Sequence, residues 1–140
     1  MKGFSAIALL LFVASCASLP GQNSLYAIYA DYKASANQGN ILDVYTHYFS
    51  PRLVAEDEPD ESAIPFLLFK DEMGSEGRHF EAMESQDAGC LTVEGFGREN
   101  GDPLEFNIRY VKVDGQWYMD GTHIRFLESV EEFSGEAVCP

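Results

Sequence analysis

An Asp-Gly pair, Asp114 and Gly115, separates the two segments of the chain that most clearly have the character of strands. These segments cover residues 104–113 and 116–126, and both are rich in aromatic and β-branched residues, which are typical of β-strands. Asp-Gly between two such runs predicts a two-residue β-hairpin turn. The sequence therefore predicts an antiparallel strand pair, and the length of the turn sets which residues face each other.

This turn predicts that Val113 pairs with Gln116 and that the register continues without interruption. One face is then mostly apolar and is expected to meet the helices. Its pairs are Lys112–Trp117, Tyr110–Met119, Ile108–Gly121, Phe106–His123 and Leu104–Arg125. The opposite face is expected to pair Val111–Tyr118, Arg109–Asp120 and Asn107–Thr122. Opposite charges across a sheet stabilise it, so Arg109 and Asp120 are interpreted as a structural pair and not a catalytic one.

The segment before these strands has the apolar spacing of helices. Ser24 is a suitable N-cap for a first helix, and Gly39 is a suitable stop. A second helix is expected from Asn40 to the break at Ser50-Pro51. A third, short helix is expected after Ser62.

Two further strands are expected over residues 79–83 and 89–96, with a turn at residues 74–77 before them. Helices first and antiparallel strands afterwards predict the α+β class. The length suits one domain with one core, so residues 24–140 are expected to form a single domain.

The first residues have the organisation of an export signal. Lys2 precedes nine consecutive apolar residues, 6–14, too few to span a bilayer, which takes roughly 20. The sequence Val13-Ala14-Ser15-Cys16 then resembles the bacterial lipobox. The resemblance implies a lipoprotein signal peptide over residues 1–15, lipid on Cys16, and a lipidated tether over residues 16–23. An ordinary secretory signal that contains a cysteine is the alternative.

Lipidation would hold the domain in the cell envelope, because several acyl chains together give stable membrane attachment. Ala17 follows Cys16. In lipoproteins that resemble this one, an aspartate at this position often means retention in the inner membrane. The expected location is therefore the periplasmic face of the outer membrane of a Gram-negative cell.

The chain has three cysteines, Cys16, Cys90 and Cys139. An odd cysteine in an exported protein needs an explanation, and lipidation of Cys16 supplies one. Export takes the other two into an oxidising compartment. A disulfide between Cys90 and Cys139 is therefore expected, and two separately buried thiols are the alternative.

The chain is strongly acidic, with 23 acidic and nine basic residues and a net charge of −14. Such a surface repels nucleic acid, whose binding requires neutralised phosphates. It also repels anionic lipid head groups, so membrane contact is expected through the lipid on Cys16. The acidic run over residues 56–61 lacks the alternating ligands and central glycine of a calcium loop, so it is interpreted as a solvated loop.

Three segments resemble the nuclear transport factor 2-like (cystatin-like) superfamily. They are the aromatic segment over residues 26–32, the segment over residues 44–53 and the final hairpin over residues 106–121, which ends Val-Asp-Gly-Gln-Trp-Tyr-Met-Asp-Gly. The resemblance implies N-terminal helices packed on a curved antiparallel sheet, which forms a cone with a pocket at its open end. This superfamily includes isomerases, dehydratases, binding proteins and exported domains without known activity, so the fold alone does not define a function.

His123 is the strongest candidate for chemistry in such a pocket. The predicted register places it beside Phe106, where a histidine could act as a base near neutral pH. Tyr45 or Tyr110 could then donate to an oxyanion. The remaining candidate pocket residues are Trp117, Met119 and Arg125.

Against catalysis, the isomerases of this superfamily carry an aspartate or an Asp–His pair inside the cone, and here Asp120 is expected on the other face. His123 is therefore interpreted as a partly buried structural residue, and no catalytic residue is assigned. The other histidines, His47 and His79, lack the close spacing of a zinc motif. No metal or cofactor is predicted.

The leading hypothesis is a membrane-anchored exported domain that binds a small apolar ligand or an envelope protein without catalysis. The high aromatic content could line a ligand pocket, but the preferred interpretation is that it fills the core. The alternatives are an isomerase- or hydrolase-like enzyme that uses His123, and a structural subunit of an envelope complex.

Overall fold

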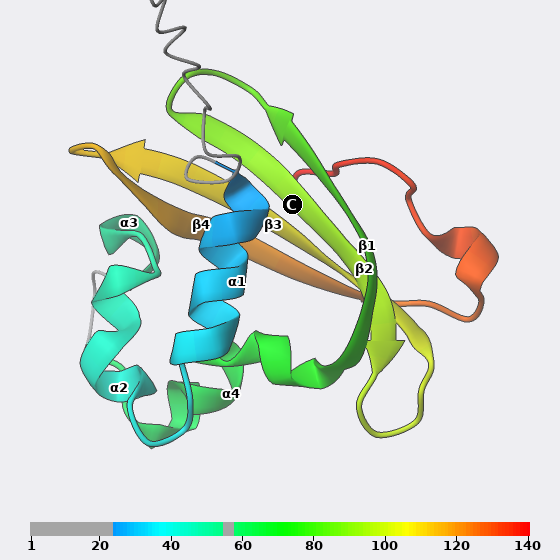
Figure 1. Ribbon diagram of the computed structural model, residues 1–140. Coiled ribbons are helices and arrows are strands. Elements are labelled where there is room, and N and C mark those ends of the chain that lie inside the picture. Colours follow the sequence, from blue (N-terminus) through cyan, green and yellow to red (C-terminus); the bar gives the residue numbers. More distant parts are fainter. Residues whose placement is uncertain (1–23, 55–57) are drawn as a thin grey trace, which may run out of the picture.

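A computed structural model describes residues 24–54 and 58–140 of the chain (Figure 1). The predicted signal peptide, the lipidation site at Cys16 and the tether over residues 16–23 lie outside the described residues. None of the helices in the described part is both long enough and apolar enough to cross a membrane.

Four antiparallel strands form one open sheet in the order β1-β2-β3-β4. The strands are β1 (Met73–Met83), β2 (Ala88–Gly97), β3 (Pro103–Val113) and β4 (Gln116–Phe126). Short helices precede the sheet in sequence, so the α+β class predicted from the sequence is confirmed. The predicted turn at residues 74–77 is wrong, because β1 runs through it with irregular pairing near Ser75 and Gly77.

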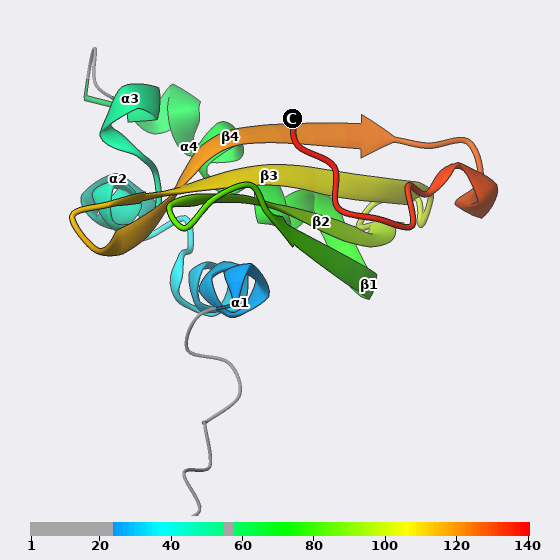
Figure 2. The same ribbon diagram turned by 90° about the horizontal axis from the view of Figure 1, so that it is seen from above.

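Helix α1 (Leu25–Ser35) packs across one face of the sheet, as Figures 1 and 2 show. The predicted N-cap is confirmed, since the Ser24 side chain accepts a hydrogen bond from the Ala27 N–H. A second acceptor comes from the sheet. The Glu81 carboxylate of β1 accepts from the backbone N–H groups of Leu25 at 3.2 Å and Tyr26 at 2.7 Å. These N–H groups have no partner within the helix, and the positive end of the helix dipole favours the carboxylate.

The second predicted helix is broken into shorter pieces. Helix α2 (Ile41–Val44) passes into the 3-10 helix η1 (Tyr45–His47), and Phe49 then forms a bridge with Met119 of β4. Helix α3 (Pro51–Val54) begins at Pro51, where the second predicted helix was expected to end. Proline is well tolerated in the first turn of a helix. The remaining short helices are η2 (Glu61–Ala63), α4 (Ile64–Leu67), η3 (Phe69–Glu72) and η4 (Val130–Glu132).

The core lies between these helices and the inner face of the sheet, and aromatic side chains fill it. Its fully buried large residues include Tyr29, Tyr32, Phe49, Phe106 and Tyr110. The Tyr32 hydroxyl donates to the Leu67 carbonyl at 2.6 Å, which satisfies it inside the core. The ring of Phe69 packs edge-on against Phe106 and stacks on Tyr32, so the rings of the helices and the sheet interlock.

The predicted β3–β4 turn is confirmed. Asp114 and Gly115 have φ values of 50° and 81°, the left-handed conformations that this hairpin turn requires. The predicted pairs from Val113–Gln116 to Tyr110–Met119 are also confirmed. Beyond them the register is wrong by one residue, because a β-bulge leaves Asp120 without a partner on β3 and pairs Arg109 with Gly121.

The bulge moves the end of β4 to new partners. His123 pairs with Asn107 and Arg125 with Glu105, so both basic side chains lie on the outer face of the sheet. Phe106 pairs instead with Ile124, and Leu104 with Phe126. The predicted contacts of His123 and Arg125 with the apolar inner face are therefore wrong.

Asp120, the extra residue of the bulge, is bound by Ser50, which precedes α3, and by Arg52 of α3. Its carboxylate accepts from the Ser50 hydroxyl at 2.6 Å and from Arg52 Nε at 3.0 Å and a terminal nitrogen at 2.9 Å. Burial opposes ionisation of Asp120, but the hydrogen bonds from Arg52 and Ser50 outweigh it and lower its pKa. The predicted Arg109–Asp120 pair is replaced by Arg52–Asp120, and Arg109 contacts Glu84 at 3.2 Å.

The C-terminal tail, residues 127–140, runs back along the outer face of the sheet (Figures 1 and 2). Buried polar side chains of β2 and β3 hold it there. The N–H groups of Ser134, Gly135 and Val138 donate to Glu105, Glu94 and Thr92 at 3.0, 2.8 and 2.8 Å. Cys90 of β2 and Cys139 of the tail lie at disulfide distance, with Cα atoms 5.2 Å apart, as the sequence predicted.

Candidate functional site

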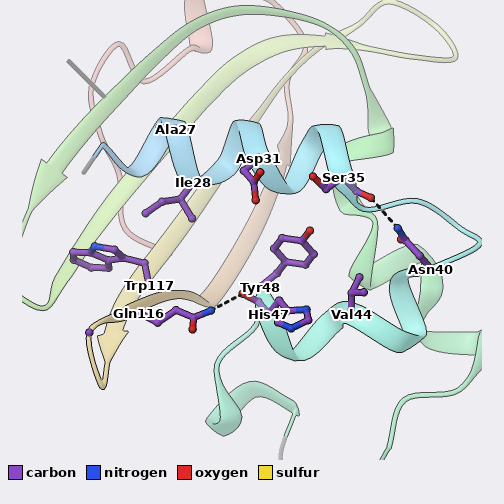
Figure 3. A pocket seen from close by; sticks show the side chains of 11 residues that line it. Ala27, Ile28, Asp31, Ser35, Asn40, Val44, His47, Tyr48, Gln116 and Trp117 are labelled. Atoms are coloured by element: carbon purple, nitrogen blue, oxygen red, sulfur yellow. Dashed lines mark hydrogen bonds between the residues drawn. The ribbon is translucent and has the colours of Figure 1, made fainter. Parts of the chain in front are cut away.

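A groove of about 720 Å³ opens between α1, the α2–η1 segment and the tip of the β3–β4 hairpin. Figure 3 shows that three separate parts of the chain supply its walls. Its lining residues are Ala27, Ile28, Asp31, Ser35, Asn40, Val44, His47, Tyr48, Gly115, Gln116 and Trp117. Its volume falls in the range of ligand sites, but it is open to solvent along its length.

The groove combines an apolar floor with polar sides. Ile28, Val44 and Trp117 are half-buried and pack against the core. The Asp31 side chain points from α1 into the groove, and His47 lies on the opposite side (Figure 3). A surface of this kind can bury an apolar side chain while polar groups at the edge fix its orientation.

Helical spacing explains the α1 wall. Ile28, Asp31 and Ser35 are separated by three and four residues, which places them on one flank of the helix. Leu25, Tyr29 and Tyr32 form the neighbouring buried stripe. The groove is therefore lined by the flank of α1 that lies beside this buried stripe.

The hairpin fixes the position of Trp117. The register before the bulge pairs Trp117 with Lys112, and the Lys112 ammonium lies 5.7 Å from the centre of the indole ring. This distance is within the range of a cation–π contact. Beside it, Gln116 reaches toward the His47 carbonyl at 3.5 Å, so the hairpin tip and η1 are close neighbours (Figure 3).

Of the predicted pocket residues, Trp117 lines this groove. Phe106, Tyr110 and Met119 are at most 1% exposed and belong to the core, and Tyr45 packs against it. The Tyr110 hydroxyl has no hydrogen-bond partner in the described part of the chain, and burial raises its pKa well above the usual value. The inner face of the sheet is therefore filled by side chains where the resemblance implied a pocket.

His123 is exposed on the outer face, whereas Tyr110 is buried on the inner face. His123 and Tyr110, one of the two oxyanion donors considered for an isomerase-like enzyme, thus lie on opposite sides of the sheet. Arg125 faces outward as well, where it pairs with the buried Glu105. The structure does not bring His123 and Tyr110 together.

Glu84, Cys90 and Cys139 form the one cluster of potential metal ligands found among residues 24–54 and 58–140. The two sulfurs lie at bonding distance from each other. Metal binding by cysteine requires the thiolate, which a disulfide does not provide. The cluster is therefore explained by the cysteine pair.

Sequence reasoning missed most of the groove, including Ile28, Asp31, Val44 and His47. One signal was present in α1, where Ile28 and Asp31 lie on a flank beside the apolar stripe. The contributions of Val44 and His47 depend on the break after α2, which local spacing does not reveal. Comparison with protein-family models, curated proteins and solved structures gave no match to this chain.

Proposed function

We propose that this chain is an exported lipoprotein whose folded domain binds a segment of an envelope protein in the groove, without catalysis. The observation that carries the proposal is an open groove with an apolar floor beside a filled core. A filled core leaves little room for an enclosed small ligand, whereas an open groove suits a protein segment.

The partner segment is expected to carry an apolar anchor and at least one basic residue. The anchor would pack between Ile28 and Trp117, and the basic residue would lie near Asp31. The net charge of −14 favours encounter with a basic partner and disfavours acidic ones. A small apolar ligand is the second candidate, because the groove volume of about 720 Å³ also lies within the usual range for such ligands.

The proposed location is the periplasmic face of the outer membrane, with membrane contact through lipid on Cys16. Its support is the lipobox-like sequence Val13-Ala14-Ser15-Cys16 and the alanine at position 17. We further propose that the domain belongs to the nuclear transport factor 2-like superfamily. Packing of α1 across one face of an antiparallel sheet supports this relationship.

Cys16→Ser should abolish lipid attachment, because serine lacks the sulfur that carries the lipid. Labelling cells with radioactive palmitate should mark the native chain and leave the Cys16→Ser chain unlabelled. A Cys90→Ser/Cys139→Ser chain is the matched control and should keep the label. Label that persists in the Cys16→Ser chain would contradict the anchor.

Trp117→Ala should weaken partner binding by about 2 kcal/mol, or roughly 30-fold, as expected for a buried aromatic anchor. A photo-reactive residue at Gln116, on the groove edge, should give a discrete crosslinked product in the cell envelope. That product should be lost in Trp117→Ala and retained in Val113→Ala, a control on the same hairpin that does not line the groove.

The same photo-reactive residue at Glu99, in the distant β2–β3 connection, tests the specificity of the product. Identical products from Gln116 and Glu99, or none from either, would contradict a partner site in the groove. Native mass spectrometry of the protein taken from its host addresses the second candidate, since a retained small molecule would replace the protein segment as the ligand.

A further inference from the structure

A second cavity, of about 280 Å³, lies on the other flank of α1 and is lined by a cluster of cations. It is bounded by α1, the end of η3, the beginning of β1 and Arg98. Lys33 and Tyr29 enter it from α1, Lys70 from η3, and Arg98 from the connection after β2. Ile28 and Asp31 face away from it, so this cavity is separate from the groove.

The charge of the cavity is opposite to that of the chain. Three of the nine basic residues line it, together with two carboxylates, Asp71 and Glu76. The difference, three minus two, gives its lining a net charge of +1, whereas the chain carries −14. An anion in solution is therefore repelled by most of the surface and attracted locally here.

The two carboxylates do not use all the donors around them. Glu76 accepts from Lys33 Nζ at 2.6 Å and from the Tyr26 hydroxyl at 2.7 Å, one hydrogen bond on each of its oxygens. Asp71 accepts from Lys70 Nζ at 2.9 Å, and its carbonyl accepts from Arg98 Nε at 2.7 Å. An ammonium group has three donors and a guanidinium five, so several N–H groups are left for an added acceptor.

Two of these polar groups are withdrawn from solvent. The Lys70 side chain is only 9% exposed. Tyr29 is fully buried, and its hydroxyl lies near the Glu76 carboxylate but forms no hydrogen bond of good geometry within residues 24–54 and 58–140. A buried hydroxyl without a partner is costly, and such groups call for a specific explanation. A ligand oxygen in the cavity would supply this hydroxyl with a well-placed acceptor.

The backbone of β1 shapes the wall of the cavity. Gly74 lies so close to Arg98 that a Cβ on it would be 2.9 Å from the Arg98 Cα. The irregular pairing between Met73 and Ser75 occurs at the same place. The absence of a side chain at Gly74 thus lets the Arg98 backbone pack against the strand and keeps its guanidinium beside Asp71.

We infer that this cavity is a binding site for a small oxyanion, a compound with a carboxylate or phosphate group. Lys70, Lys33 and Arg98 would neutralise its charge, and the Tyr29 hydroxyl would donate a hydrogen bond to it. A volume of about 280 Å³ admits a short-chain carboxylate or a simple phosphate. Oxyanions are bound strongly by such charge-assisted hydrogen bonds.

The test is a titration of the full-length chain in non-ionic detergent with inorganic phosphate and, separately, with succinate, followed by amide NMR shifts. Saturable shifts of the amides from Lys70 to Glu76 and of Arg98 are expected with at least one probe. Sodium chloride at matched ionic strength should not produce them. Saturation by phosphate alone or by succinate alone supports the site and identifies the anionic group of the ligand.

Lys70→Met removes a cation and keeps most of the side chain, and it should weaken probe binding about tenfold or more. Tyr29→Phe removes only the hydroxyl and keeps the buried ring, so it should fold normally and still weaken binding about threefold to tenfold. The control is Lys112→Met, which makes the same charge change outside the cavity and should change binding less than about twofold. Circular dichroism establishes that each variant is folded.

Shifts that stay linear up to about 50 mM probe, a concentration far above millimolar affinity, would overturn the inference. It would equally be overturned if Tyr29→Phe and Lys70→Met bound the probe as tightly as Lys112→Met. These outcomes are independent of the groove, because Trp117→Ala should leave the titration unchanged.

Discussion

Replacing both Cys90 and Cys139 by alanine should lower the free energy of unfolding by about 4 kcal/mol, the chain-entropy estimate for their sequence separation of 49 residues. Chemical denaturation under oxidising conditions measures this loss. The native chain should lose a similar amount when a reductant is added, whereas the double-alanine chain should not respond. A native chain that is insensitive to reductant would contradict the bond.

Hydrogen exchange shows where the loss arises. The tail amides of Ser134, Gly135 and Val138 donate to side chains of the sheet, so each reports whether the tail is in place. They should exchange faster in the double-alanine chain, while the amides of β3 remain protected. Equal protection of the three tail amides in both chains would show that the tail stays bound without Cys139.

Arg125→Met should destabilise the domain by about 3 kcal/mol, because it leaves the fully buried Glu105 carboxylate without its cation. A Glu105→Met/Arg125→Met chain should recover much of the loss, since it buries no uncompensated charge. Arg109→Met is the matched control on β3. Its partner Glu84 is 42% exposed, whereas Glu105 is fully buried, so the expected loss is about 1 kcal/mol or less. Urea denaturation of the chains compares these values.

The pH dependence of the same chains separates a charge effect from a packing effect. Burial raises the pKa of Glu105, but hydrogen bonds from Ser134, Arg125 and Asn107 outweigh burial and lower it overall. The folded state therefore gains stability above the usual pKa of 4.5, and this gain is lost as the pH falls through the lower folded value. Arg125→Met should reduce this slope, and an unchanged slope would contradict the role of the ion pair.

The hairpin illustrates what the sequence could predict. Asp114 and Gly115 specify the turn, and the pairs next to it follow from the turn length. The bulge at Asp120 was missed, although the pattern of β4 contains its signal. Trp117 and Met119 face the core two residues apart, but the next inward residue, Ile124, is five residues after Met119. An odd spacing of this kind requires one extra residue in the strand, which is what a bulge provides.

The outer face shows why other features could not be predicted. Glu94 and Glu105 alternate with apolar residues, as do the outward positions of a sheet that faces water. In the structure the tail covers them, and their partners are Arg78 and Arg125 together with backbone groups of the tail. Local pattern does not distinguish a solvent-facing carboxylate from one covered by a distant segment.

The end of the helix after α2 could not be predicted either, because it also depends on a contact with a distant segment. Tyr45 and Tyr48 continue the apolar spacing of a helix, but the backbone of this segment pairs with β4. The Tyr48 carbonyl accepts from the Met119 N–H at 2.7 Å, and the Ser50 N–H donates to the Met119 carbonyl at 2.8 Å. A tertiary contact thus overrides local helical preference. The groove depends on this break, so its prediction required the fold.

The contacts between α1 and β1 determine how the domain would carry a mechanical load. Glu81 holds the first N–H groups of α1, and Glu76 holds both the Tyr26 hydroxyl and Lys33 farther along the helix. A pull on the chain before Ser24 would pass through these side chains into β1. That strand is paired with β2 along most of its length, so the force would be shared by many backbone hydrogen bonds. Tension at the amino-terminal end would therefore be transmitted from α1 into the sheet.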